Sequence, residues 1–202
     1  MAAAAREAGV QIVTGDTKVV QRGACDQLFI NTTGIGHLLV QPEPSGHRAR
    51  PGDAVLVSGA VGDHGLTIMG RREGLSFLTD VRSDSAPLNG LVRAVFAAAD
   101  GRLATTLNEI AEQSGVSIEL DEQAIPVHEA VRSGCSFLGL DPLYLANEGK
   151  CLCIVPETLA DTVLAAMRAT PYGREATRIG TVGDERAGQV VLRTLIGGQR
   201  LL

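Results

Sequence analysis

The sequence predicts an α/β (α+β) protein in which helices alternate with strands. Of its 202 residues, 45% are hydrophobic and 20% are charged, which provides enough apolar material for a core of ordinary size. Short apolar runs typical of buried strands alternate with segments whose apolar residues recur every three or four positions, as in amphipathic helices. The 24 glycines and the low aromatic content of 3% favour tight turns and close backbone approaches.

The N-terminal part is expected to contain one helix and two strands. The Ala-rich stretch 1–8 predicts an amphipathic helix that ends near Gly9. Residues 10–20 are typical of a strand interrupted by a polar turn, and residues 28–33 form a second β-rich run. The best candidate for a linker is 41–52, which contains three prolines and two glycines.

We place a domain boundary in this linker, which divides the chain into residues 1–45 and 46–202. After the boundary, apolar runs bounded by turn residues predict strands, and longer periodic segments with capping residues predict helices. Strands are expected at 54–59, 116–120, 150–155, 177–182 and 189–195. Helices are expected at 62–69, 88–99, 103–113, 127–138 and 156–168.

Charge and hydropathy exclude several classes of function. The formal net charge is -5 and the arginines are scattered singly, which argues against a nucleic-acid surface. No apolar run approaches the roughly 20 residues needed to cross a bilayer. The start of the sequence lacks the basic and apolar pattern of a secretory signal, so we expect a cytoplasmic protein.

The four cysteines do not form a metal-binding or disulfide pattern. No CxxC pair occurs among Cys25, Cys135, Cys151 and Cys153, and we interpret them as buried free thiols. Cys151 and Cys153 are two positions apart in an expected strand, so their side chains should share one face.

A first candidate site lies in the turn Gly15–Lys18. Asp16 can supply a hard oxygen ligand to magnesium, Thr17 a hydroxyl, and Lys18 a positive charge for phosphate oxygens. The alternative is a solvated β-turn with a local ion pair.

A second candidate lies at Gly62–Gly65, where an expected strand leads into a helix. Backbone N–H groups at such a junction attract anions, and Asp63 or His64 can cap the helix or orient a ligand. The spacing matches neither a dinucleotide fingerprint nor a P-loop. The alternative is an Asp63 cap beside a surface histidine. We interpret the other histidines as surface residues: His37, His47 and His128.

A third candidate, Asn147–Lys150, lies between an apolar segment and an expected strand. Glu148 in such surroundings is a candidate general base, and Asn147 can orient a substrate amide. The alternative is a hairpin turn that carries ordinary charges.

Six segments, in order and with matching spacing, carry a resemblance to a known family. They are Ile12–Val20 (IVTGDTKVV), Phe29–Gly36 (FINTTGIG), Pro51–Gly59 (PGDAVLVSG), Gly62–Gly65 (GDHG), Leu103–Ala111 (LATTLNEIA) and Leu140–Lys150 (LDPLYLANEGK). Over nearly its whole length the sequence resembles the HypE family of hydrogenase maturation proteins.

The resemblance implies both a fold and a reaction. HypE belongs to the superfamily of aminoimidazole ribonucleotide (AIR) synthetase and selenophosphate synthetase, which implies an AIR-synthase-like fold. Residues 1–45 would then be the remnant of an N-terminal ATP-binding domain, and residues 46–202 a C-terminal domain with a mixed sheet and flanking helices. The family uses ATP and Mg²⁺ to dehydrate a carbamoyl group, received on its C-terminal cysteine from the carbamoyltransferase HypF, into a thiocyanate. The cyanide passes to the HypC–HypD complex and then to the iron of [NiFe] hydrogenase, and the family usually forms homodimers.

The same resemblance assigns roles to the candidate residues. Lys18 and Glu148 match catalytic positions, and Glu148 is expected to take a proton from the thiocarboxamide. Asp16 and Thr17 match the ATP region, with Asp16 as the metal ligand. Three further residues are expected to line or support the same site: Asp63, His64 and Asn147.

The sequence also departs from the family pattern. The early acidic and glycine-rich nucleotide-binding segments are not in this chain, and Asp100–Arg102 stands where the family has a loop of the type Asp-Pro-Thr-Arg-Gly-Gly. None of the four cysteines occupies the place of the carbamoylated C-terminal cysteine. These departures leave two hypotheses: an incomplete ATP-dependent dehydratase, or an inactive family fragment that acts as a binding partner or scaffold in hydrogenase maturation.

Overall fold

The computed structural model describes residues 1–25, 27–37, 45–75, 81–99 and 107–202. In these ranges the chain forms a six-stranded sheet with the order β3-β1-β4-β2-β5-β6. Neighbouring strands are antiparallel except for β2 and β5, which are parallel. The predicted α/β fold with a mixed sheet is therefore confirmed. The strands are β1 (Ala54–Val57), β2 (Ser117–Asp121), β3 (Leu152–Val155), β4 (Thr177–Gly183), β5 (Val190–Arg193) and β6 (Gln199–Leu201).

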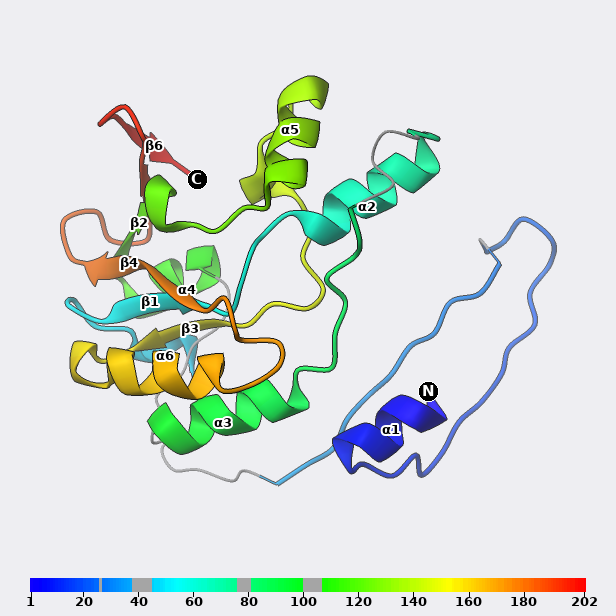
Figure 1. Ribbon diagram of the computed structural model, residues 1–202. Coiled ribbons are helices and arrows are strands. Elements are labelled where there is room, and N and C mark those ends of the chain that lie inside the picture. The colour runs from blue at the N-terminus through cyan, green and yellow to red at the C-terminus, as the bar shows by residue number, and fades with distance from the viewer. Residues whose placement is uncertain (26, 38–44, 76–80, 100–106) are drawn as a thin grey trace.

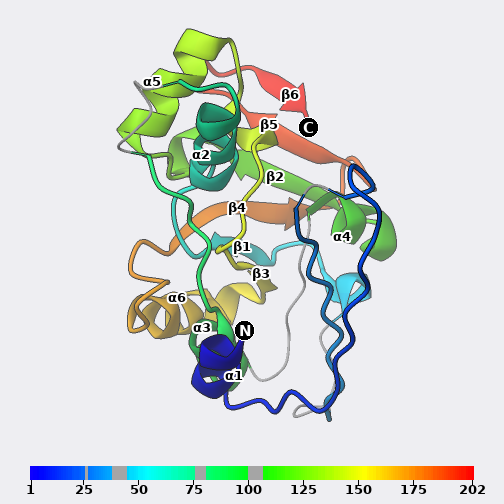
Figure 2. The ribbon, with the colours of Figure 1, turned by 90° about the vertical axis from the view of Figure 1, so that its right-hand side faces the viewer.

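Helices cover both faces of the sheet, and a further pair packs beside one end of it (Figures 1 and 2). On one face α3 and α6 lie together, and on the other lies α4. Helices α2 and α5 pack against each other near the end of β1. The helices are α1 (Ala2–Ala8), α2 (Asp63–Arg72), α3 (Asn89–Ala99), α4 (Leu107–Ser114), α5 (Glu129–Leu138) and α6 (Ala160–Arg168).

Strand β1 explains why both faces need cover. All four of its residues are buried. Because side chains alternate along a strand, Ala54 and Leu56 enter the core under α3 and α6, and Val55 and Val57 enter the core under α4. A strand buried on both faces has a continuous apolar sequence rather than an alternating one, which is the pattern of this run.

Most of the expected elements are confirmed, with shifted ends. The helix expected from residue 156 begins with a short 3-10 turn, Glu157–Leu159, before α6. The helix expected at 103–113 is present as α4, and residues 103–106 lie outside the described ranges, as does the departure at Asp100–Arg102. Strand β6 was not expected, because its three residues are too few to show a strand period. It forms by a hairpin in which the Thr194 N–H donates to the Gly198 carbonyl.

The two strands expected before the linker are not formed, and that prediction was wrong. Residues 10–20 and 28–33 have no strand pairing, and Figure 1 shows this part of the chain extended away from the sheet. A β-rich sequence becomes a strand only when a neighbour satisfies its backbone N–H and C=O groups, and these residues have no such neighbour within the described ranges. The expected helix is present as α1, and Gly9 ends it in the left-handed conformation, with φ of 69°.

Candidate functional site

The end of β1 brings two of the candidate motifs together. Gly62, with φ of 93°, turns the chain from the strand into α2. Gly65, in the first turn of α2, packs directly against the backbone that precedes Asn147, and its N–H donates to the Ala146 carbonyl at 2.9 Å. A Cβ atom at Gly65 would lie 2.8 Å from the Ala146 nitrogen, so glycine is needed for this approach. The loops 62–65 and 147–150 are thus adjacent in space.

Asp63, the first residue of α2, is held by a histidine from another element. The Asp63 residue is 6% exposed, and His128 Nδ1 lies 3.0 and 3.1 Å from its two carboxylate oxygens. On the other side of the ring, His128 Nε2 lies 3.5 Å from Glu175 Oε2. The hydrogen bond to Asp63 raises the pKa of His128, although burial lowers it, and the charges of Asp63 and Glu175 raise it further. The arrangement is a carboxylate–imidazole–carboxylate chain.

The backbone of the 147–150 loop is fixed by side chains on both sides. The Gly62 N–H donates to Asn147 Oδ1 at 2.9 Å, and Asn147 Nδ2 donates to the Leu145 carbonyl at 3.1 Å. The Glu148 N–H donates to Asp84 Oδ1 at 3.1 Å. Within the described ranges, the exposed Glu148 carboxylate itself makes no hydrogen bond or ion pair. The loop is therefore anchored, and the carboxylate that it presents is free to act.

A buried carboxylate lies beneath this loop. The Asp84 side chain is 2% exposed, and Lys150 Nζ lies 3.8 Å from its Oδ2 atom. That oxygen has no hydrogen-bond partner within the described part of the chain. A Cβ atom at Gly149 would overlap the Asp84 carbonyl, so only glycine allows the loop to lie this close. We call this group the β1-end cluster, and it consists of Asp63, Asp84, His128, Glu148, Lys150 and Glu175.

The other predicted site residues lie outside this cluster or serve it indirectly. His64 Nδ1 lies 2.9 Å from Ser83 Oγ, so it contacts the residue next to Asp84. Asp63 does not cap α2, because Gly62 occupies the cap position. Asp16, Thr17 and Lys18 are exposed on the extended N-terminal segment. The Thr17 N–H donates to Asp16 Oδ1 at 2.8 Å, as in a local turn, and within the described ranges no hydrogen bond or ion pair joins these three residues to the β1-end cluster.

Three members of the cluster were missed from the sequence. His128 was interpreted only as a surface residue; its side chain is indeed 49% exposed, but it also bonds Asp63 across 65 positions, which the sequence did not indicate. Asp84 and Glu175 were not singled out. None of the three belongs to a local motif, and tertiary contacts alone reveal them. The only sequence signal was that His128 immediately precedes an expected helix.

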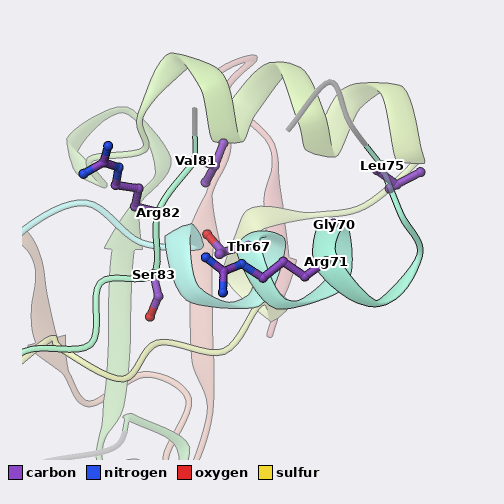
Figure 3. Close-up of a pocket in the computed structure, with 7 residues that line it drawn as sticks. All are labelled: Thr67, Gly70, Arg71, Leu75, Val81, Arg82 and Ser83. Atoms are coloured by element: carbon purple, nitrogen blue, oxygen red, sulfur yellow. The ribbon is translucent and has the colours of Figure 1, made fainter. Parts of the chain in front are cut away.

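A separate cavity of about 580 Å³ lies beside α2 (Figure 3). Figure 3 shows the Arg71 side chain running along α2 toward Thr67, while the Arg82 side chain points away from Arg71. Ser83 lines the cavity and also contacts His64, which connects the cavity wall to the β1-end cluster. Its lining residues are Thr67, Gly70, Arg71, Leu75, Val81, Arg82 and Ser83.

Two further observations concern metal ions and membranes. Within the described ranges, no group of three or more His, Cys, Asp or Glu side chains is arranged to hold a metal ion. No helix in those ranges is long and apolar enough to cross a membrane.

Comparison with known proteins gives consistent matches over the whole chain. The family model described as AIR synthase related protein, C-terminal domain, matches residues 50–193. The carbamoyl dehydratase HypE of Azotobacter vinelandii is 54% identical over 212 residues, which cover 100% of this chain and 62% of that protein. The chain therefore spans about three fifths of the length of this curated relative.

Solved structures show the same similarity. The crystal structure of a hydrogenase maturation protein HypE in complex with ATP matches with a TM-score of 0.93 and 58% identity, over 99% of this chain and 64% of that one. A HypE–HypF complex matches with a TM-score of 0.92 and 44% identity, over 100% of this chain and 69% of the matched chain.

Proposed function

Because the chain belongs to the AIR synthase related family as a HypE-type member, we propose that it is the greater part of a carbamoyl dehydratase that acts in hydrogenase maturation. The proposed reaction removes water from a carbamoyl group bound to a cysteine sulfur and produces a thiocyanate, the source of the cyanide ligands of [NiFe] hydrogenase. The compartment that we propose is the cytoplasm, where ATP is available.

The observation that carries this proposal is the anchored loop that presents Glu148. Asn147 ties the loop to Gly62, and Asp84 ties it to the protein core, while the Glu148 carboxylate stays free of partners within the described ranges. A base must be held in place and yet be uncommitted if it is to accept a proton from a substrate. This is the arrangement that removal of protons from a thiocarboxamide nitrogen requires.

We assign roles in the reaction accordingly. Glu148 accepts a proton from the nitrogen of the substrate. Asn147 holds the backbone of the loop in place, because its amide oxygen accepts from the Gly62 N–H and its amide nitrogen donates to the Leu145 carbonyl. Asp63 and His64 fix the start of α2 and the Ser83 segment beside the loop. Lys18, the second catalytic residue of the proposal, is placed to meet phosphate oxygens only when the N-terminal segment closes onto this end of the sheet.

Nucleotide binding is assigned to the N-terminal segment. Magnesium bound with a nucleotide uses about one or two protein carboxylates together with phosphate oxygens and water, so the single carboxylate of Asp16 fits one of these positions. Thr17 and Lys18 would contact the phosphates. When bound, ATP supplies the phosphoryl group that turns the amide oxygen into a leaving group. We propose that residues 1–45 belong to the ATP-binding domain and that residues 46–202 form the C-terminal domain.

The proposed partners follow from the same assignment. We propose that a HypF carbamoyltransferase supplies the carbamoyl group and that a HypC–HypD complex receives the cyanide; a solved HypE–HypF complex supports the first of these. A homodimer is proposed on the evidence of the extended segment. Val13 is 85% exposed and Val19 is 89% exposed there, and an unpaired extended segment of this kind is stabilised when another chain covers it.

Calorimetry with this chain tests the proposal. We expect binding of Mg-ATP and of a peptide that ends in an S-carbamoylated cysteine, and we expect the mixture to convert the S-carbamoyl group into a thiocyanate that stays on the peptide, with loss of the mass of one water from the peptide. Glu148→Gln should retain peptide binding and lose turnover, whereas Lys18→Ala should weaken nucleotide binding. The matched control is Glu185→Gln, an exposed glutamate outside the β1-end cluster. If the chain binds neither ligand, the scaffold hypothesis replaces the enzymatic one.

A further inference from the structure

Two buried thiols lie directly against each other at the base of the β1-end cluster. Cys151 Sγ and Cys153 Sγ are 3.5 Å apart, close enough for one thiol to donate a hydrogen bond to the other sulfur. Cys153 is 0% exposed and Cys151 is 8% exposed, and both belong to the core under α3 and α6. The proposed dehydratase reaction uses neither of them.

The position of Cys151 allows the backbone to tighten. The ladder between β1 and β3 ends at the pair Val57 and Leu152, so Cys151 lies just beyond it. Two residues of extended strand span about 6.6 Å at about 3.3 Å per residue, which is near the upper limit of about 6.8 Å between the Cα atoms of a disulfide. The two sulfurs, 3.5 Å apart, must approach to the roughly 2.05 Å of a disulfide, so closure requires Cys151 to move inward from its place beyond the ladder.

We propose that Cys151 and Cys153 are a site of reversible oxidation, at which a peroxide converts the adjacent thiols into a disulfide. Cys151 is the attacking residue, because it is the one at the accessible end of the strand. Cys153, enclosed in the core, is the resolving residue. The proposal does not depend on the proposed dehydratase activity, because it concerns thiols that the reaction does not use.

The chemistry balances with hydrogen peroxide as the oxidant. The Cys151 thiolate attacks one peroxide oxygen, the O–O bond breaks, and the departing hydroxide takes a proton to become water. Cys153 then attacks the sulfenic sulfur of Cys151. The S–S bond forms, the S–O bond breaks, and a second water leaves with the Cys153 proton. The two sulfurs lose two electrons in total, and the peroxide is reduced to two water molecules.

The thiol pair is suited to this order of events. The hydrogen bond from Cys153 lowers the pKa of Cys151, whereas that same bond and burial raise the pKa of Cys153. The other buried thiol, Cys135 in α5, is a natural comparison. Burial raises its pKa, and no sulfur neighbours it within the described ranges.

The pair is linked to the β1-end cluster through the backbone. The Ser58 N–H donates to the Cys151 carbonyl at 2.9 Å, and the Cys151 N–H donates to Ser58 Oγ at 2.9 Å. Ser58 begins the turn into α2, and Lys150, which faces Asp84, immediately precedes Cys151. A movement of Cys151 on oxidation therefore displaces both loops of the candidate site.

Peptide mass analysis of the peroxide-treated chain tests the proposal. The folded chain is treated with hydrogen peroxide, quenched with catalase, unfolded in the presence of N-ethylmaleimide and digested with trypsin. Cleavage after Lys150 and Arg168 releases one peptide that contains both cysteines. We expect this peptide to be lighter by two hydrogens and unlabelled, to regain two labels after dithiothreitol, and Cys135 to remain labelled throughout.

A variant distinguishes formation of the disulfide from oxidation of Cys151 alone. In Cys153→Ala, the sulfenic acid on Cys151 should persist and react with dimedone, and Cys135→Ala, the matched control, should close the disulfide as the parent chain does. If Cys153→Ala does not fold, the parent chain still decides the matter. The proposal is overturned if the peptide of the folded parent keeps both labels, or if Cys151 accumulates as sulfenic acid while Cys153 stays labelled.

Discussion

The amide of Asn147 accepts a hydrogen bond from the Gly62 N–H at 2.9 Å, across 85 positions of sequence. This bond ties the turn into α2 to the loop that presents Glu148. The bond from Gly65 to the Ala146 carbonyl runs beside it. The contact between these two loops therefore depends in part on a side chain that has no chemical role in the proposed reaction.

Asn147→Ala should destabilise the protein more than an ordinary surface change. The buried Gly62 N–H loses its acceptor, and an unsatisfied buried donor costs about 1–3 kcal/mol. The free energy of unfolding from urea titration measures this. Asn108→Ala, at an exposed position on α4, is the control and should change stability by less than about 0.5 kcal/mol. Equal effects for the two variants would contradict the anchoring role.

Gly65→Ala and Gly90→Ala should have opposite effects although both glycines lie in helices. A Cβ atom at Gly65 meets the backbone of Ala146 and the Leu145 side chain, and overpacking of this kind costs about 1–3 kcal/mol. A Cβ atom at Gly90 meets nothing within 4 Å, so alanine should stabilise α3 by about 0.5–1 kcal/mol. Thermal denaturation of the two variants gives the signs, and a stabilised Gly65→Ala protein would exclude the close packing described here.

The unfolding free energy should depend on pH through His128. Its pKa in the folded state is raised above the ordinary value of 6.5, so folding favours the protonated ring. This contribution is fully present below about pH 6.5 and is lost as the pH rises through the raised folded-state pKa. The groups that face the ring are Asp63 from α2 and Glu175 from the segment before β4.

His128→Gln tests this dependence. The stability difference between the parent chain and the variant should be largest at pH 5–6, as a raised pKa above about 6.5 requires, and should shrink toward pH 9. Urea titrations across that range measure the difference. His37→Gln, at an exposed position, should give a difference that does not change with pH. A His128→Gln difference that grows with pH would have the wrong sign for this pair.

The proposed homodimer should depend on the extended N-terminal segment. Val13→Asp together with Val19→Asp places charges on side chains that are 85% and 89% exposed in the single chain. We expect sedimentation to show a dimer for the parent chain and a monomer for this variant, with no loss of thermal stability of the sheet. Ile196→Asp, at a side chain that is 96% exposed in the β5–β6 hairpin, should leave the dimer intact. A monomeric parent chain would remove this part of the proposal.

The sheet and its helices could be predicted because their signals are local. The buried run at β1 and the periodic apolar residues of α2 and α5 each carry their own pattern. The runs 10–20 and 28–33 also show a β pattern, but strand formation depends on a partner that local sequence does not supply. A similar limit applies to the site. Asp63, Asn147 and Glu148 were found from turn motifs, whereas Asp84 and Glu175 enter only through contacts that the fold creates.

The strand order also has a consequence for synthesis on the ribosome. β4 lies in the middle of the sheet, between β1 and β2, yet it is the fourth strand to be made, and β3 is made only shortly before it. At roughly 5–20 residues per second, about 5–20 s pass between completion of β1 and the appearance of its first partner at residue 152. During that interval the apolar β1 strand has two open edges in the nascent chain. A pause in translation between β1 and β3 would prolong this exposure, so a ribosome-associated chaperone would have its greatest effect on yield there.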